Sequence, residues 1–422
     1  MVEKLIVNNF AGIKALEMDI RQINILIGPQ ASGKSVCAKL LFYFKSFVWE
    51  ILSVVENEQT KRHLDSNYSK TFEEYFPPDS WGNHDFFIRY EISDVFIEIS
   101  RKQDRKEKIS LSYSEFFKEE LAALRTSLKK IKEKKYERID RLYFTREALR
   151  ESLAKLLNNS LCKEAAFMQL FIPAGRSFFA NLQSNIFSFL SSNNSLDPFL
   201  RAFGSTYENI KVVRFKHRSD DKREIKSIQD EITRLIEKSL CGKHVQEKGK
   251  DFLESSDGRR ISVANSSSGQ QETLPLTIML AALPFLTSSH SGQTVYIEEP
   301  EAHLFPSAQR SIIELIATVF NYRKEELQFF ITTHSPYVLT AINNLLQAGI
   351  LYQTVDQDVL HQLEKIVPKY KALNTSDLSA YVLANGKCHS IICPDTGLID
   401  AKIIDSVSDE LSIEFDKLLN LA

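Results

Sequence analysis

The 422-residue sequence has few of the residues that mark specialised chains: 14 Gly, 12 Pro and 5 Cys. So few Gly and Pro exclude a collagen-like, Pro-rich or largely disordered chain. The cysteines are odd in number and spread along a long chain, which predicts free thiols of a reducing cytosol rather than a disulfide framework. We therefore expect a cytoplasmic protein.

Net charge and long apolar runs are also scarce. The 53 Lys and Arg nearly balance the 55 Asp and Glu, which leaves −2 and excludes a polybasic coat for nucleic acid, although not a local basic patch. The longest apolar run, residues 274–286, contains Pro275 and Pro284 and is too short to span a bilayer. The amino terminus lacks the basic start and apolar stretch of a signal peptide, so we expect no membrane association.

The pattern that is present is typical of an α/β fold. The almost wholly apolar run Ile23–Ile27 predicts a strand buried on both faces, as in a parallel sheet. From Thr294 onward, strand and helix patterns alternate again. We predict an α/β domain with a mixed or parallel sheet, made of an N-terminal lobe (1–105) and a C-terminal lobe (246–422). Residues 106–245 are predicted to form an inserted helical, short coiled-coil lobe.

Two helix patterns lie outside the predicted sheet. Inside the insertion, apolar residues at spacings of 4, 3, 4 and 3 predict a short coiled coil: Phe117, Leu121, Leu124, Leu128 and Ile131. The surrounding stretch, 118–141, has nine Lys or Arg against five Asp or Glu, either as a solvated face or as a surface for a partner or nucleic acid. Near the end, a second pattern predicts a helix packed in the head core, or else a docking surface: Leu411, Phe415, Leu418 and Leu419.

A loop follows the apolar strand and fits G-x-x-x-x-G-K-[ST] at every fixed position: Gly28, Pro29, Gln30, Ala31, Ser32, Gly33, Lys34 and Ser35. Because a strand precedes it and a helix pattern follows, it predicts a P-loop. The glycines let backbone N–H groups wrap phosphates at the positive end of a helix. Lys34 would reach the β- and γ-phosphates, and the Ser35 hydroxyl would hold Mg²⁺. The sequence thus predicts that the chain binds ATP with Mg²⁺.

Acids and a histidine end two further predicted strands. Residues 294–297 are apolar and lead into Glu298 and Glu299. Beside a P-loop, Glu298 would bind Mg²⁺ through water and Glu299 would deprotonate the attacking water, the alternative being two exposed loop acids. The next strand pattern ends at His334, which would sense the γ-phosphate.

A second anion-binding pattern occurs far from the P-loop. A hairpin signal at Asp257-Gly258 precedes small residues that open a helix pattern: Ser267, Ser268, Gly269 and Gln270. One subunit rarely needs two cradles for one nucleotide. This segment is therefore predicted to close over a nucleotide held by another subunit, the alternative being a capped helix start.

Along the chain the four segments follow in the order P-loop, residues 267–270, the strand ending in Glu298 and Glu299, and the loop with His334. In this order they resemble the ABC-type ATPase heads of the SMC, RecF and OLD group. The resemblance implies that Ser267 to Gln270 form the signature motif and that Ala302 and His303 belong to the D-loop. It also implies that Glu299 is the catalytic base and His334 the switch histidine, while Glu298 stands where many members have Asp. The Ile-Pro-Ala-Gly-Arg176 segment is similar to the I-P-A-x-R motif of small stand-alone ATPases. It lies where a Q-loop is expected but has no Gln, so Arg176 is assigned that role, with a buried structural turn as the alternative.

The resemblance is greatest to stand-alone ATPases of anti-phage defence, of the PARIS type and less closely the Septu type. It implies a sensor that controls a separate toxic effector, a Toprim-type nuclease, with a phage protein as trigger. Only 88 residues follow His334, and the acids Asp395, Asp400, Asp405 and Asp409 among them lack the D-x-D spacing, so we do not expect the chain itself to be a nuclease. It is expected to form an ATP-sandwiched dimer or a higher homo-oligomer. The alternative is a RecF- or SMC-like ATPase that binds DNA in repair; a transport ATPase fits less well.

Overall fold

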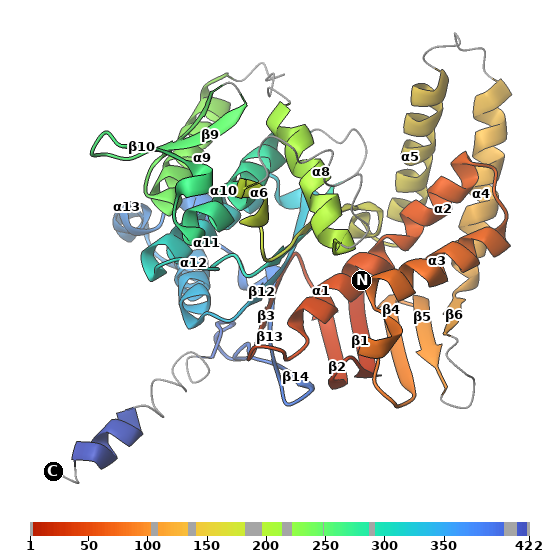
Figure 1. Ribbon diagram of the computed structural model, residues 1–422, viewed down its shortest axis with the longest axis horizontal. Coiled ribbons are helices and arrows are strands. Elements are labelled where there is room, and N and C mark those ends of the chain that lie inside the picture. Colours follow the sequence, from red (N-terminus) through yellow and green to blue (C-terminus); the bar gives the residue numbers. More distant parts are fainter. Residues whose placement is uncertain are drawn as a thin grey trace.

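The computed structural model describes residues 3–102, 109–133, 141–181, 196–212, 222–247, 249–286, 292–400 and 412–419. An eleven-stranded sheet crosses the molecule in the order β6-β5-β4-β1-β2-β14-β13-β3-β12-β11-β7, and a separate sheet has the order β10-β9-β8 (Figure 1). The strands are β1 (Glu3–Phe10), β2 (Ile13–Ile20), β3 (Ile23–Ile27), β4 (Phe86–Ile92), β5 (Val95–Arg101), β6 (Ser110–Tyr113), β7 (Met168–Ile172), β8 (Lys243–Glu247), β9 (Lys250–Glu254), β10 (Arg260–Ser262), β11 (Gln293–Glu298), β12 (Leu327–Thr333), β13 (Leu378–Ala384) and β14 (Lys387–Ser390).

The large sheet is mixed. Strands β13, β3, β12, β11 and β7 are parallel neighbours, whereas β6, β5, β4, β1 and β2 pair antiparallel. All five residues of β3 are buried, with Ile25 in one apolar core and Leu26 in the other. The prediction of a strand buried on both faces, within an α/β fold, is confirmed.

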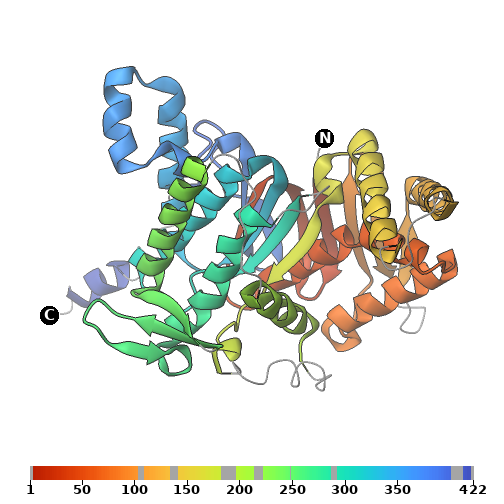
Figure 2. The same ribbon diagram turned by 90° about the horizontal axis from the view of Figure 1, so that it is seen from above.

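Helices cover both faces of the sheet, as Figures 1 and 2 show. Their bounds are α1 (Lys34–Lys45), α2 (Phe47–Glu56), α3 (Lys61–Tyr75), α4 (Glu115–Glu133), α5 (Arg141–Ser160), α6 (Phe178–Asn181), α8 (Pro198–Val212), α9 (Lys222–Leu240), α10 (Ser268–Ala282), α11 (Pro306–Tyr322), α12 (Pro336–Thr354) and α13 (Gln357–Ile366). Helices α1 to α5 share one core with the antiparallel strands, and α10 to α12 share the other with the parallel strands. Among the described helices, none is both long and apolar enough to cross a membrane.

The predicted insertion contributes both helices and strands. Helices α4 and α5 pack together as an arm, and the predicted seam of α4 is buried at Phe117, Leu121, Leu124 and Leu128. The basic stretch 118–141 lies partly outside the described residues. Two strands from the range 106–245, β6 and β7, belong to the large sheet. The head therefore draws part of its sheet from the segment that the sequence assigns to the helical lobe.

The last described segment is a helix over residues 412–419. Its apolar side chains are exposed: Phe415 by 60%, Leu418 by 57% and Leu419 by 58%. The prediction that they pack in the head core is therefore wrong for these three residues, and Leu411 lies outside the described residues. The physical reason is that an apolar stripe predicts a helix that buries one face, but does not identify the surface against which it packs.

Candidate functional site

The predicted site residues come together at one edge of the large sheet. Strands β3, β11, β12 and β7 are parallel, so their carboxyl ends meet at this edge, where α/β proteins bind ligands. The P-loop follows β3, Glu298 ends β11 and His334 follows β12. The loop with Arg176 follows β7. Residues separated by up to 300 positions thus surround one space.

The P-loop is shaped by two glycines that cannot be replaced without movement. A Cβ atom on Gly28 would lie 2.2 Å from the carbonyl oxygen of Leu383, and Gly33 has a φ of +102° with no room beside Ile13. Lys34 closes the loop by donating to the carbonyl oxygens of Gly28 and Pro29, both at 2.8 Å. Burial lowers the pKa of Lys34, although nearby acids oppose this. The loop thus encloses the ammonium group of Lys34, and such a loop is suited to binding the negatively charged phosphates of a nucleotide.

The imidazole of His334 joins the P-loop lysine to the predicted base. Its Nδ1 lies 3.2 Å from Nζ of Lys34, and its Nε2 lies 2.9 Å from Oε1 of Glu299. Because an ammonium group only donates, Nδ1 accepts and Nε2 carries the hydrogen given to Glu299. Glu299 itself has a φ of +45°, an uncommon backbone conformation for a residue other than glycine. The three residues form one hydrogen-bonded chain.

Two further acids extend from the end of β11. Glu298 is buried; its Oε2 accepts from the backbone N–H of Ala174 at 3.1 Å, while its Oε1 has no hydrogen-bond partner. Oε1 of Glu301 accepts from the Thr333 hydroxyl and from the backbone N–H of His334, both at 2.7 Å. Glu301 therefore fixes the loop that presents His334. The sequence resemblance placed Glu301 in the D-loop segment Glu301–Leu304, but it did not predict these contacts to Thr333 and His334.

Arg176 is fully buried, and its guanidinium group binds backbone carbonyl oxygens. Nε donates to the carbonyl oxygen of Glu272 at 3.1 Å, and Nη2 donates to that of Glu299 at 3.0 Å. Nη1 donates to the carbonyl oxygens of Pro173 at 2.8 Å and of Glu298 at 2.7 Å. Its backbone N–H also donates to the Glu272 carboxylate at 2.9 Å. Burial lowers the pKa of Arg176, while Glu272 opposes this. Arg176 thus ties the end of β11 to α10 and is engaged with the protein backbone.

The predicted signature residues open α10. Ser267 caps this helix in a reciprocal capping box with Gln270, which also donates to the carbonyl oxygen of Leu240 at 2.8 Å. A Cβ atom on Gly269 would lie 2.5 Å from the carbonyl oxygen of His303, so the first turn of α10 packs directly on the D-loop segment. Ser267 and Ser268 are exposed. The structure therefore places the predicted signature and D-loop segments together and leaves Ser267 and Ser268 at the surface, with the Ser267 hydroxyl hydrogen-bonded to Gln270.

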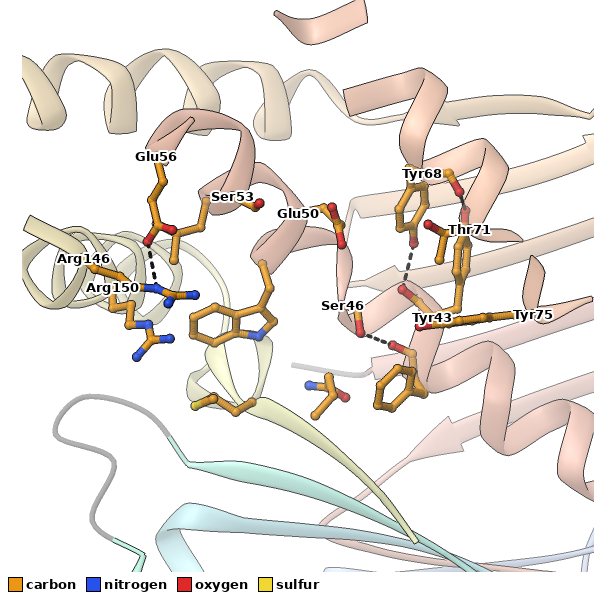
Figure 3. Close-up of a pocket in the computed structure, with 15 residues that line it drawn as sticks. Tyr43, Ser46, Glu50, Ser53, Glu56, Tyr68, Thr71, Tyr75, Arg146 and Arg150 are labelled. Carbon is orange, nitrogen blue, oxygen red and sulfur yellow. Dashed lines mark hydrogen bonds and ion pairs between the residues drawn. The ribbon is translucent and has the colours of Figure 1, made fainter. Parts of the chain in front are cut away.

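A separate cavity lies where the arm meets the head. Its volume is about 340 Å³, and its walls come from α1, α2, α3, α5 and β7. Figure 3 shows Arg146 and Arg150 at one end, with Glu56, and Tyr68 and Tyr75 at the other. None of its lining residues belongs to the P-loop, the end of β11 or the His334 loop. This cavity is therefore distinct from the candidate nucleotide site.

Comparison with known families agrees with the P-loop geometry. A family model described as an AAA ATPase domain, AAA_15, matches residues 1–339. The chain belongs to the AAA_15 family. It is thus an ATPase-type domain, and the match covers the P-loop, the end of β11 and His334.

Solved structures with similarity to this AAA_15 chain include SMC head domains and RecF. The SMC head domain from Thermotoga maritima has 10% identity over 92% of this chain and 98% of its own, with a TM-score of 0.36. The Smc head domain with an extended coiled coil, bound to the C-terminal domain of ScpA from Pyrococcus furiosus, is 13% identical. The match covers 97% of this chain and 99% of that one, with a TM-score of 0.38. The recombination mediator protein RecF is 12% identical over 93% of this chain and 98% of its own, with a TM-score of 0.33. At these scores, the family assignment rests on the sequence match.

Proposed function

We propose that this AAA_15 chain hydrolyses ATP at the edge formed by β3, β11 and β12. The observation that supports this most directly is the chain from Lys34 through His334 to Glu299. Lys34 would bind the phosphates, and Glu299 would take a proton from the attacking water. His334, already hydrogen-bonded to Glu299, would orient that carboxylate and report on the phosphate that Lys34 binds.

The residues at the site fit Mg²⁺. Oε1 of Glu298 is buried without a hydrogen-bond partner, and the exposed Ser35 hydroxyl opens α1 beside Lys34. Hard oxygen ligands of this kind are those that Mg²⁺ prefers. When bound, the ion would neutralise phosphate charge. Ser35 and Glu298 would hold it, while Arg176 fixes the backbone of Glu298.

We further propose that two copies pair as ABC-type heads, with the signature of one copy closing on the ATP of the other. The exposure of Ser267 and Ser268 supports this, because within its own chain α10 packs its first turn on His303 and leaves these two residues at the surface. Such pairing would place Ala302 and His303 of the D-loop at the contact. Opening and closing of the pair would then depend on ATP.

The sequence resemblance to stand-alone defence ATPases supports a regulatory role. In this proposal, ATP-dependent pairing controls a separate toxic effector, such as a Toprim-type nuclease, in response to a phage protein. The chain itself would supply the ATPase and no nuclease centre. A RecF- or SMC-like role on DNA would use the same hydrolysis, so partner capture distinguishes the two roles.

Two variants test the ATPase proposal. Lys34→Ala should lose ATP binding, whereas Glu299→Gln should bind ATP and hydrolyse it at least about 100-fold more slowly. Undiminished hydrolysis by Glu299→Gln would refute the assignment of the base. Native mass spectrometry of Glu299→Gln, purified with ATP from cells that express its gene neighbours, then tests the role. A stoichiometric second protein supports effector control, and a pair that retains only DNA supports the repair alternative.

A further inference from the structure

A basic groove lies on the outer side of the lobe that contains α13. It is formed by α9, α11, α12, α13 and the short 3₁₀ turn Lys369–Lys371, and its volume is about 220 Å³. The surface of the groove is mostly polar, and it is lined by five cations, one acid and five other residues: Arg234, Lys238, Arg310, Lys365 and Lys371, with Glu314, and Leu345, Ile366, Val367, Pro368 and Tyr370. We call this set the basic groove.

The charge of the basic groove is only partly neutralised within the chain. Lys371 binds the carboxylates of Glu231 and Glu314, each at 2.8 Å, and these two acids also pair with Arg234 and Arg310. Five cations against these two acids leave a net charge of +3. The rim also exposes apolar surface, because Ile366 is 72% exposed and Tyr370 is 38% exposed. A surface that is both cationic and apolar favours an acidic, amphipathic partner.

The helix at residues 412–419, here called the tail helix, has the complementary pattern. At 100° per residue, Phe415, Leu418 and Leu419 form one stripe, and Glu414 and Asp416 flank it on its two sides. Ile413 and Lys417 lie on the opposite side. The stripe is more than half exposed at every one of its three positions. An apolar stripe between two acids is complementary to a cationic groove at which Ile366 and Tyr370 are exposed.

The sequence around the tail helix strengthens this complementarity. Residues 405–417 contain five acids and one base, a net charge of −4: Asp405, Asp409, Glu410, Glu414, Asp416 and Lys417. The eleven residues between Asp400 and Ser412 span at most about 40 Å when extended. The tail can therefore reach a neighbouring molecule.

We propose that the tail helix of one copy docks in the basic groove of a second copy. Phe415, Leu418 and Leu419 pack on Ile366 and Tyr370, while Glu414 and Asp416 meet the cations of the rim. A second copy is the occupant because the tail helix leaves its stripe exposed within its own chain. This contact does not require nucleotide, so it goes beyond ATP-dependent pairing of heads.

The location links the contact to the ATPase site. Arg310 lies in the second turn of α11, which begins directly after the D-loop segment. Helix α9, the other wall, ends at Leu240, whose carbonyl oxygen accepts from Gln270 of the signature segment. Docking of the tail helix would therefore restrain the D-loop and the signature segment, the two segments that contact the other copy in the proposed head pair.

Sedimentation of the full chain without nucleotide tests the proposal. The wild type should self-associate with rising concentration, and Phe415→Asp combined with Leu418→Asp should weaken this at least about 10-fold. Ile413→Asp is the matched control, because it makes the same change on the opposite side of the same helix and should associate like the wild type. Lys34→Ala should also associate normally, which separates this contact from a failure of the ATPase proposal.

A charge exchange tests the pairing of the two surfaces. Lys238→Glu with Lys365→Glu should weaken association at least about 10-fold, and mixing that chain with a Glu414→Lys, Asp416→Lys chain should restore a hetero-pair. A wild type that remains monomeric at every concentration would overturn the proposal. So would equal association of the Phe415 and Ile413 variants, or no restoration on mixing. A monomer whose groove is protected from hydrogen exchange only when the tail is present would assign the occupant to the same chain and equally overturn docking between copies.

Discussion

Nε2 of His334 lies 2.9 Å from Oε1 of Glu299, and the other ring nitrogen faces the ammonium of Lys34. One imidazole therefore contacts both the group that would bind phosphate and the group that would activate water. Its backbone is fixed independently, because the N–H of His334 donates to Glu301 at 2.7 Å. The position of this ring is therefore fixed by contacts within the chain.

This relationship predicts that His334 affects hydrolysis more than binding. In His334→Ala, Glu299 loses its hydrogen-bond donor, so the rate of hydrolysis should fall about 10- to 100-fold. The Kd for ATP should change less than about threefold, since Lys34 and the glycine loop remain. Single-turnover hydrolysis and equilibrium binding measure the two quantities. His361→Ala, an exposed histidine of α13, is the control, and equal rates in the two variants would contradict the assigned contact.

Arg176 is predicted to be a structural and positioning residue. Arg176→Met leaves buried carbonyl oxygens of Glu272, Pro173, Glu298 and Glu299 without donors, so the free energy of unfolding should fall by about 3 kcal/mol. Arg176→Lys should restore little of this, because one ammonium cannot replace a planar fork.

Urea unfolding measures the loss. Arg201→Met, which removes an exposed guanidinium with a surface ion pair to Glu74, serves as the control and should cost no more than about 0.5 kcal/mol. Similar stabilities for the two Met variants would show that the carbonyl contacts of Arg176 do not support the fold.

Local patterns made the P-loop predictable from sequence. The glycine spacing, the apolar strand before it and the helix pattern after it all lie within about 25 residues, and the structure has each of them. The burial of both faces of β3 followed from its continuous apolar residues. These features depend on neighbours in the chain, so the sequence contains the information that specifies them.

Contacts between distant segments could not be predicted in the same way. The acceptors of Arg176 lie as far as 123 residues away, and their approach depends on the parallel register of β7 beside β11. The role of Glu301 likewise depends on β12 lying beside β11. The tail helix shows the same limit, because its apolar stripe is visible in the sequence but the exposure of that stripe is not.

The close approach of Gly269 to the D-loop predicts a defect at a distance from the P-loop. In Gly269→Ala, the new Cβ atom would lie 2.5 Å from the carbonyl oxygen of His303, so the D-loop must shift. Hydrolysis should fall about 10-fold while the affinity of the P-loop for ATP is retained. Gly242→Ala, where the nearest atom would lie at 3.1 Å, is the control. Wild-type hydrolysis in Gly269→Ala would mean that the D-loop position does not affect the reaction.

The buried ion pairs of Lys371 predict a dependence of stability on pH. Burial alone would raise the pKa of Glu314, but the ammonium of Lys371 and the guanidinium of Arg310 outweigh it and hold that pKa below its ordinary value. The same balance lowers the pKa of Glu231, with Arg234 in place of Arg310. Because the folded-state pKa values are depressed, the stabilisation is present above about pH 4.5 and is lost as the pH falls through them.

Lys371→Met removes the shared cation. The variant should be less stable than the wild type by about 2 kcal/mol at pH 7, because two largely buried carboxylates lose a partner. The difference should shrink towards pH 3, where protonated carboxyl groups no longer need the ammonium. Thermal unfolding at pH 7, 5 and 3.5 measures it, with the exposed Lys369→Met as the matched control. A difference between Lys371→Met and wild type that stays constant over this range would show that the loss comes from packing and not from the ion pairs.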